Sequence, residues 1–126
     1  MGIIIKEVEI IGDKGKGKAK ILFDSGATNS LIRRDIAEKI SSLTKWSEPV
    51  DFTLGDGKTV VKSEFYTALQ ININGNKIPG QLFHVVENIE EELILGADAF
   101  QRWKFKLDFE KEDVIIDKNV LRLRLV

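Results

Sequence analysis

Apolar and polar residues alternate with a period of two along much of this chain, which is typical of β-strands that bury one face. Near the start, Val8 and Ile10 alternate with acidic residues. The same pattern recurs in residues 104–110, where aromatic and leucine residues alternate with charged ones, and in residues 121–125, where leucines alternate with arginines. Each of these segments is predicted to be a half-buried strand.

Two dipeptides indicate tight connections between strands. Asn74-Gly75 and Asp56-Gly57 each lie between two strand-like segments. Residues of these types tolerate the positive φ angles that short β-hairpin turns require, so each dipeptide predicts a hairpin. The glycine-rich residues 12–17 predict a flexible turn between the first two strands.

Helical periodicity is scarce. In residues 33–40, Ile36 and Ile40 lie one helical turn apart, which predicts a short amphipathic helix. Residues 97–103 are a second candidate, and Asp98 is a plausible N-cap for this helix. We therefore expect an all-β fold, a closed or strongly curled β domain with one or two short helices.

Length and composition are those of one globular domain over residues 1–126. The 19 basic and 20 acidic residues give a net charge of −1, so no overall field favours nucleic acid or an anionic membrane. The absence of cysteine excludes disulfides, thiol catalysis and thiolate metal sites. No stretch approaches the roughly 20 apolar residues of a membrane span. We expect a cytoplasmic protein without nucleic-acid or membrane partners.

The candidate chemistry begins with Asp24-Ser25-Gly26-Ala27-Thr28, directly after an apolar strand-like segment. Alone, these residues are common in turns, and an ordinary strand-ending turn explains them. A second motif changes the interpretation.

This second motif spans residues 92–98 and contains Ile94-Leu95-Gly96. It follows about seventy residues after Asp24 and directly precedes the second predicted helix. The combination resembles the retropepsins, the retroviral-type aspartic peptidases, and is closer to their cellular and retroelement members. The four parts of the family pattern occur in order: the Asp-Ser-Gly-Ala turn, a hairpin with glycine at its tip, two apolar residues followed by glycine, and a short helix. The resemblance covers roughly residues 18–117 and implies the retropepsin-like acid-protease fold.

The resemblance also implies a chemistry. Asp24 would be the catalytic residue, and because the chain has one such turn, the second carboxylate would come from another copy of the chain in a homodimer. Two carboxylates about 3 Å apart share one proton. The ionised one would take a proton from a bound water while the protonated one donates to the cleaved carbonyl, with no metal, cofactor or covalent intermediate.

Further roles follow from the same resemblance. Ser25 would form a hydrogen bond across the two-fold axis, and Gly26 would let an extended peptide approach the backbone. The hairpin over residues 54–57 would be a flap that opens for substrate and closes over it. The active-site support would comprise Ser25, Gly26, Ala27, Thr28, Ile94, Leu95 and Gly96, and the substrate-binding flap Leu54, Gly55, Asp56 and Gly57.

Thr28 and Ala97 depart from viral members, which often carry an Asp and an Arg at these positions. Both members of that ion pair are missing together, so a different interface or pocket is expected. The substrate would be an extended peptide with apolar side chains beside the cleaved bond. An acidic to mildly acidic pH optimum is expected, because the shared-proton state must be populated.

Other conspicuous residues are expected to be structural. His84 is predicted to lie on the polar face of a strand, and residues 90–92 to form a solvated acidic loop. The lysines of residues 14–20 are predicted to be a solvated hairpin face, because no aromatic platform accompanies them. The chain ends are predicted to be strands that either join the domain's own sheet or interleave with a second subunit.

Two alternatives stay open at this point. A dimerisation or peptide-binding module could keep the fold without catalysis, and Asp24→Asn would then cause no loss of function. An unrelated small β-barrel could carry the Asp-Ser-Gly turn by chance, and this predicts a monomer.

Overall fold

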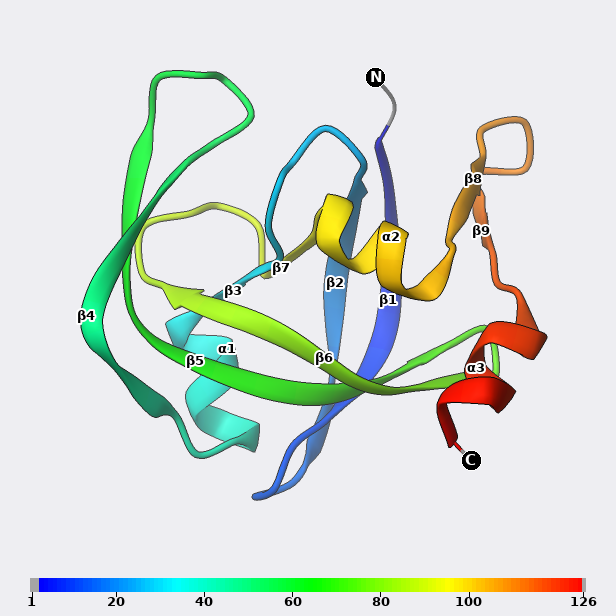
Figure 1. Ribbon diagram of the computed structural model, residues 1–126, viewed down its shortest axis with the longest axis horizontal. Helices are drawn as coiled ribbons and strands as arrows, with labels where there is room; N and C mark the ends of the chain where they lie inside the picture. The colour runs from blue at the N-terminus through cyan, green and yellow to red at the C-terminus, as the bar shows by residue number, and fades with distance from the viewer. Residues whose placement is uncertain (1–2, 126) are drawn as a thin grey trace.

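The computed structural model describes residues 3–125, which form nine strands and three helices (Figure 1). The strands are β1 Ile3–Ile11, β2 Lys16–Asp24, β3 Leu31–Arg33, β4 Thr44–Thr53, β5 Val60–Ile73, β6 Asn76–Val86, β7 Leu93–Leu95, β8 Lys106–Asp108 and β9 Asp113–Ile115. The helices are α1 Arg34–Ile40, α2 Ala97–Trp103 and α3 Lys118–Leu125. None of the helices in this part of the chain is long and apolar enough to cross a membrane.

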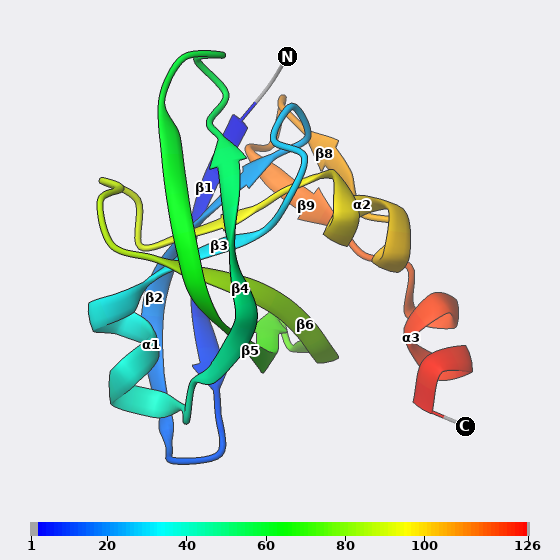
Figure 2. The ribbon, with the colours of Figure 1, turned by 60° about the vertical axis from the view of Figure 1, so that its left-hand side comes forward.

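Six strands close into a barrel in the order β1-β2-β7-β3-β6-β5, and β1 pairs with β5 to complete it. Strand β4 pairs antiparallel with the first half of β5, and the hairpin that these two strands form extends beyond the barrel (Figure 2). Closure leaves fewer unpaired sheet edges. The predicted closed β domain with short helices is therefore confirmed.

Successive residues of a strand alternate between the barrel interior and the outside, as predicted. On β1, Val8 and Ile10 are 4% and 1% exposed, while Glu7 and Glu9 face outward. The interior is filled by β-branched and aromatic side chains from nearly every strand, and Trp103 of α2 is fully buried beneath them. Each such side chain contributes roughly 1.5–3 kcal/mol when it leaves water.

The predicted hairpins are also confirmed. Asn74 and Gly75 have φ angles of 50° and 78° and connect β5 to β6. Gly57 has a φ of 74° within the loop that connects β4 to β5. The turn between β1 and β2 is closed by a hydrogen bond from the Gly12 amide to the Gly15 carbonyl at 2.8 Å.

The two predicted helices form, but the prediction that Asp98 is the N-cap of the second helix is wrong. Helix α2 begins at Ala97, and Gly96 occupies the N-cap position without a side-chain hydrogen bond. Asp98 instead lies in the first turn, where its carboxylate bonds to other elements. The cap residue is glycine because any side chain there would collide with the backbone carbonyls of Ala27 and Asn29.

The predicted C-terminal strand is wrong, because the segment forms helix α3. Asp117 accounts for this difference: its carboxylate accepts a hydrogen bond from the Asn119 amide at 2.9 Å, and its carbonyl accepts one from Val120 at 3.1 Å. Such local bonds start a helix. Phe109 is likewise not on a buried face, since β8 ends at Asp108 and the Phe109 side chain is 53% exposed.

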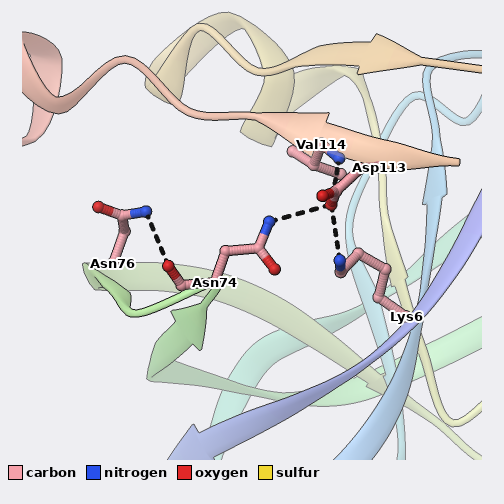
Figure 3. Close-up of polar contacts among 5 residues, drawn as sticks. All are labelled: Lys6, Asn74, Asn76, Asp113 and Val114. Carbon is pink, nitrogen blue, oxygen red and sulfur yellow. Dashed lines mark hydrogen bonds and ion pairs between the residues drawn. The ribbon is translucent and has the colours of Figure 1, made fainter. Parts of the chain in front are cut away.

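The β8–β9 hairpin is tied to the barrel by one carboxylate (Figure 3). Asp113 accepts bonds from the Lys6 ammonium at 2.6 Å and from the Asn74 amide at 3.0 Å. Its own strand neighbour Val114 donates a third, from the backbone. These donors, Lys6 first, hold the pKa of the Asp113 carboxyl well below its usual range.

Candidate active site

Strand pairing places the Asp24 turn at one end of the barrel. Strand β7 lies between β2 and β3, parallel to β2 and antiparallel to β3. The connection of residues 25–30 must therefore pass over the end of β7 on its way from β2 to β3. This arrangement puts Ile94-Leu95-Gly96 directly behind the turn that carries Asp24.

The turn itself is tight. The Gly26 amide donates to the Asp24 carboxylate at 2.9 Å, and the Ala27 amide donates to the Asp24 carbonyl at 3.1 Å. Asp24 is half-buried, while Ser25 and Gly26 are exposed. One carboxylate oxygen is thus oriented by the backbone, and the adjoining residues present an open surface.

The start of α2 anchors the far half of this turn. The Ala97 amide donates to the Ala27 carbonyl at 2.6 Å, and the Asp98 amide to the Thr28 carbonyl at 3.3 Å. A Cβ on Gly96 would lie 2.6 Å from the Asn29 carbonyl oxygen and 2.7 Å from that of Ala27. Only glycine lets the turn and the helix approach this closely.

A polar network behind the turn was not found by sequence reasoning. The Ser30 hydroxyl is fully buried, accepts from the Gly96 amide at 3.1 Å and donates to the Asp98 carboxylate at 2.7 Å. Gln81 reaches the same carboxylate at 3.4 Å and accepts from the Trp103 indole at 2.8 Å. Ser30 does lie within the first motif, but nothing in the sequence connects it with Gln81 or Trp103.

The β4–β5 loop, residues 54–59, reaches over Asp24. A Cβ on Gly55 would lie 3.9 Å from the second oxygen of the Asp24 carboxylate. The loop is closed by its own bonds, with the Leu54 amide donating to the Thr59 carbonyl and the Gly57 amide to the Leu54 carbonyl. Asp56 accepts from the Thr59 hydroxyl and from the amides of Thr59 and Lys58, the amides at 2.8 Å, and these bonds, the hydroxyl first, hold its pKa below the usual range.

A cleft of about 430 Å³ lies between this loop and the Asp24 turn. Its apolar surface comes mainly from both sides of the Asp24 turn and from β4. The lining residues are Leu22, Asp24, Ala27, Thr28, Asn29, Leu31, Asp51, Phe52, Thr53, Leu54, Gly55, Asp56, Glu91 and Ile94. The structure therefore brings Asp24, Ala27, Thr28, Ile94 and most of the predicted flap residues to one cleft. Ser25, Gly26, Leu95, Gly96 and Gly57 do not line it.

Two sequence-based expectations need correction near this cleft. The acidic loop is not simply solvated, because Glu91 and Glu92 are half-buried and Glu92 accepts a bond from the Lys20 amide at 2.7 Å. His84 is packed among aromatic rings, with its centroid 4.4 Å from Phe52 and 5.4 Å from Trp46. Burial lowers the pKa of His84, and the charge of Asp98 partly opposes this shift.

With this geometry established, comparisons with known proteins decide the family. Residues 11–102 match the family described as gag-polyprotein putative aspartyl protease. The chain belongs to this family. The match includes the Asp24 turn, the loop above it and the strand and helix behind it, and it excludes an unrelated barrel. A comparison with curated proteins finds no match.

Solved structures show the same retropepsin-like fold. The retroviral protease-like domain of Ddi1 from Leishmania major aligns with a TM-score of 0.61 and 20% identity, covering 93% of this chain and 89% of that one. A retropepsin-like aspartic protease from Rickettsia conorii aligns with a TM-score of 0.53 and 18% identity, covering 91% and 87%. At these identities the likeness concerns the fold.

Proposed function

We propose that this protein is a homodimeric aspartic endopeptidase in which Asp24 of each subunit supplies one carboxylate of the catalytic dyad. The observation that carries the proposal is the position of Asp24, at the floor of the cleft and beneath Gly55. A half-buried carboxylate with one oxygen fixed by a backbone amide is suited to holding a water.

The chemistry needs two such carboxylates. The ionised one takes a proton from water as the water oxygen attacks the peptide carbonyl, and the protonated one donates to the carbonyl oxygen. The first carboxyl then gives its proton to the nitrogen of the tetrahedral intermediate, and the second carboxylate takes a proton from one of its hydroxyls, so the C–N bond breaks and leaves an acid and an amine. Positioned acid-base groups of this kind contribute about 10²–10⁴-fold in rate. An acidic to mildly acidic optimum follows, because one proton must be shared between the two carboxylates.

The surface around Asp24 supports a second subunit. Ser25 and Gly26 are exposed beside it, and Ile3 and Ile5 of β1 are 56% and 62% exposed. Ile3 is the register partner of Asp24. The start of β1, the Asp24 turn, the β4–β5 loop and the β8–β9 turn lie at the same end of the barrel in both views (Figures 1 and 2). Exposed apolar side chains beside half of an active site favour burial against another copy.

The remaining predicted site residues take supporting roles in this proposal. Ser25 bonds across the two-fold axis and Gly26 lets the substrate backbone approach. Ala27, Thr28, Ile94, Leu95 and Gly96 hold the turn, and Leu54, Gly55, Asp56 and Gly57 form the flap. The substrate is an extended peptide, with apolar side chains beside the cleaved bond matching the apolar parts of the cleft.

The test is cleavage of a diverse peptide library between about pH 3 and 7, comparing the native chain with Asp24→Ala at matched concentration. Discrete cleavage by the native chain that falls at least about 100-fold in the variant supports the dyad. Cleavage that persists in the variant contradicts it, and the absence of cleavage by a folded, dimeric preparation favours a binding module.

A further inference from the structure

The cleft is lined by acidic residues and by no basic ones. Besides Asp24, its lining contains Asp51 of β4, Asp56 of the β4–β5 loop and Glu91 of the loop before β7, and it contains no Lys, Arg or His. The chain as a whole carries nearly equal numbers of both signs, with 19 basic and 20 acidic residues. The one-sided charge of the cleft is thus a local feature, and it favours a cationic occupant.

Glu91 is held in place by its neighbours in the chain. Arg33 donates from its backbone amide to the Glu92 carbonyl at 2.9 Å and from its guanidinium to the Glu90 carbonyl at 2.7 Å. These bonds fix the loop on both sides of Glu91. The Arg33 guanidinium also pairs with Asp35, with nitrogen–oxygen distances of 2.7 and 3.2 Å, so its charge is already matched outside the cleft.

The Glu91 carboxylate lacks a partner. Its Oε2 atom is shielded from water and accepts no hydrogen bond from any residue that the structure describes. Such an oxygen has lost its hydration without compensation, which is unfavourable for a carboxylate. The shielded oxygen is out of reach of a ligand, but a cationic group bound in the cleft beside Glu91 would bring the opposite charge that this carboxylate lacks among the described residues.

Asp51 and Asp56 add negative charge to the cleft lining. Asp56 accepts hydrogen bonds from Thr59 and Lys58 of its own loop, and these bonds lower its pKa. Asp51 has no ion pair among the described residues, and its register partner Lys62 lines a separate hollow with Arg34. The cleft lining therefore carries several acidic side chains and no basic one.

A peptide side chain fits this arrangement better than a metal ion. Among residues 3–125, no group of three or more His, Asp or Glu side chains is close enough to hold a metal. Apolar residues such as Leu22, Leu31 and Ile94 line the same cleft as these carboxylates. Apolar surface beside fixed carboxylates suits the long methylene stem and charged end of lysine or arginine.

We propose that the cleft selects peptides that carry a lysine or arginine near the apolar residues at the cleaved bond, and that Glu91 is the specificity-determining residue. This rests on the proposed peptidase function and names its substrate class. Glu91 is a binding residue here and takes no part in the proton transfers.

The test uses peptides with one fixed apolar cleavage pair and Lys, Gln or Glu placed in turn at each flanking position. For the native chain, kcat/KM at the best position should rank Lys above Gln above Glu, with about fivefold between Lys and Gln, and the ratio should shrink in high salt. Glu91→Gln should bring the Lys and Gln peptides within about twofold, and Glu91→Lys should favour the Glu peptide. Equal rates for the three peptides in the native chain, or an unchanged preference in Glu91→Gln, would overturn the proposal.

Glu90→Gln is the matched control, because Glu90 is exposed in the same loop and does not line the cleft. It removes one negative charge from the same loop and should leave the preference unchanged.

A binding measurement separates this proposal from the proposed peptidase activity. The Asp24→Asn protein is titrated with the same peptides, labelled with a fluorophore, and should show the same order of affinities. If the native chain cleaves nothing, this order still decides the proposal: Lys above Gln above Glu supports it, and equal affinities refute it.

Discussion

The turn that carries Asp24 and the loop that covers it face each other across the cleft, but the protein holds them in different ways. The turn is bonded to another element, through Ala97, Asp98 and the buried Ser30 hydroxyl. Among the residues that the structure describes, the hydrogen bonds of the loop all lie within the loop itself, and residues 55–59 are all exposed. A site that needs one fixed catalytic group and one movable cover is expected to show this division.

The largest expected effect comes from disturbing the anchored side. Gly96→Ala would place a methyl group 2.6–2.7 Å from two backbone carbonyl oxygens. Because backbone must shift to relieve this contact, we expect a loss of about 1–3 kcal/mol in the free energy of unfolding, or more, together with loss of cleavage. Urea unfolding and peptide cleavage measure the two losses.

Gly80→Ala is the control for that substitution. Gly80 lies on β6 and has nothing within 4 Å of a Cβ, so stability and activity should both be retained. Equal behaviour of the two variants would show that the close approach at Gly96 is unimportant.

A smaller effect is expected from the buried network. Ser30→Ala leaves the Gly96 amide without its acceptor and removes the shorter of the two bonds to the Asp98 carboxylate, since Gln81 still reaches it. We expect about 1–3 kcal/mol of destabilisation and a fall in kcat that exceeds any change in KM, because the turn would lose its orientation.

Ser63→Ala is the matched comparison. Ser63 is equally buried but donates to the Phe65 carbonyl on β5, outside the cleft lining. It should lose similar stability while kcat is preserved. If both variants lower kcat alike, the network at Ser30 does not position the turn.

On the loop side, Gly57→Ala imposes a φ of 74° on alanine and should cost about 1 kcal/mol. Because the strain lies in the β4–β5 loop that covers Asp24, kcat/KM for peptide cleavage should fall mainly through a higher KM. Gly75→Ala imposes the same kind of strain, at a φ of 78°, in the β5–β6 turn, and should lower stability without affecting KM. Matching KM values for the two variants would argue against a flap.

The smallest effect concerns pH. The bonds to Asp113 lower its folded-state pKa, so they stabilise the protein above the unfolded-state pKa near 3.8 and lose this contribution as the pH falls below that value. The side chain is 42% exposed, so solvent reduces the effect. Thermal unfolding of Asp113→Asn should show a weaker decline than the native chain between about pH 5 and 2, and identical declines would contradict this role.

The parts that sequence could predict are those with a local signal. Alternation placed β1, because burial on one face imposes a period of two, and the dipeptides Asn74-Gly75 and Asp56-Gly57 placed the hairpins. Gly96 was predicted to support the Asp24 turn, and the structure shows the carbonyl oxygens that a side chain at this position would meet. Asp24 was placed at the end of a strand for the same local reason.

The parts that sequence missed depend on distant partners or on competing local bonds. Helix α3 formed where alternation indicated a strand, since Asp117 starts a helix and β9 pairs only with β8. The bond between Gln81 and Trp103 and the lack of a partner for Glu91 arise only when separate elements come together. No pattern within one segment carries that information.

The central claim, that one site uses Asp24 from two chains, is tested most directly by mixing subunits. Native chain at fixed concentration is equilibrated with an equal amount of Asp24→Asn chain, and peptide cleavage is measured after exchange. If two Asp24 residues share one site, mixed dimers are inactive and the activity should fall to about half. Activity that stays unchanged, in a mixture shown to contain mixed dimers, would mean that each chain acts alone and would contradict the account.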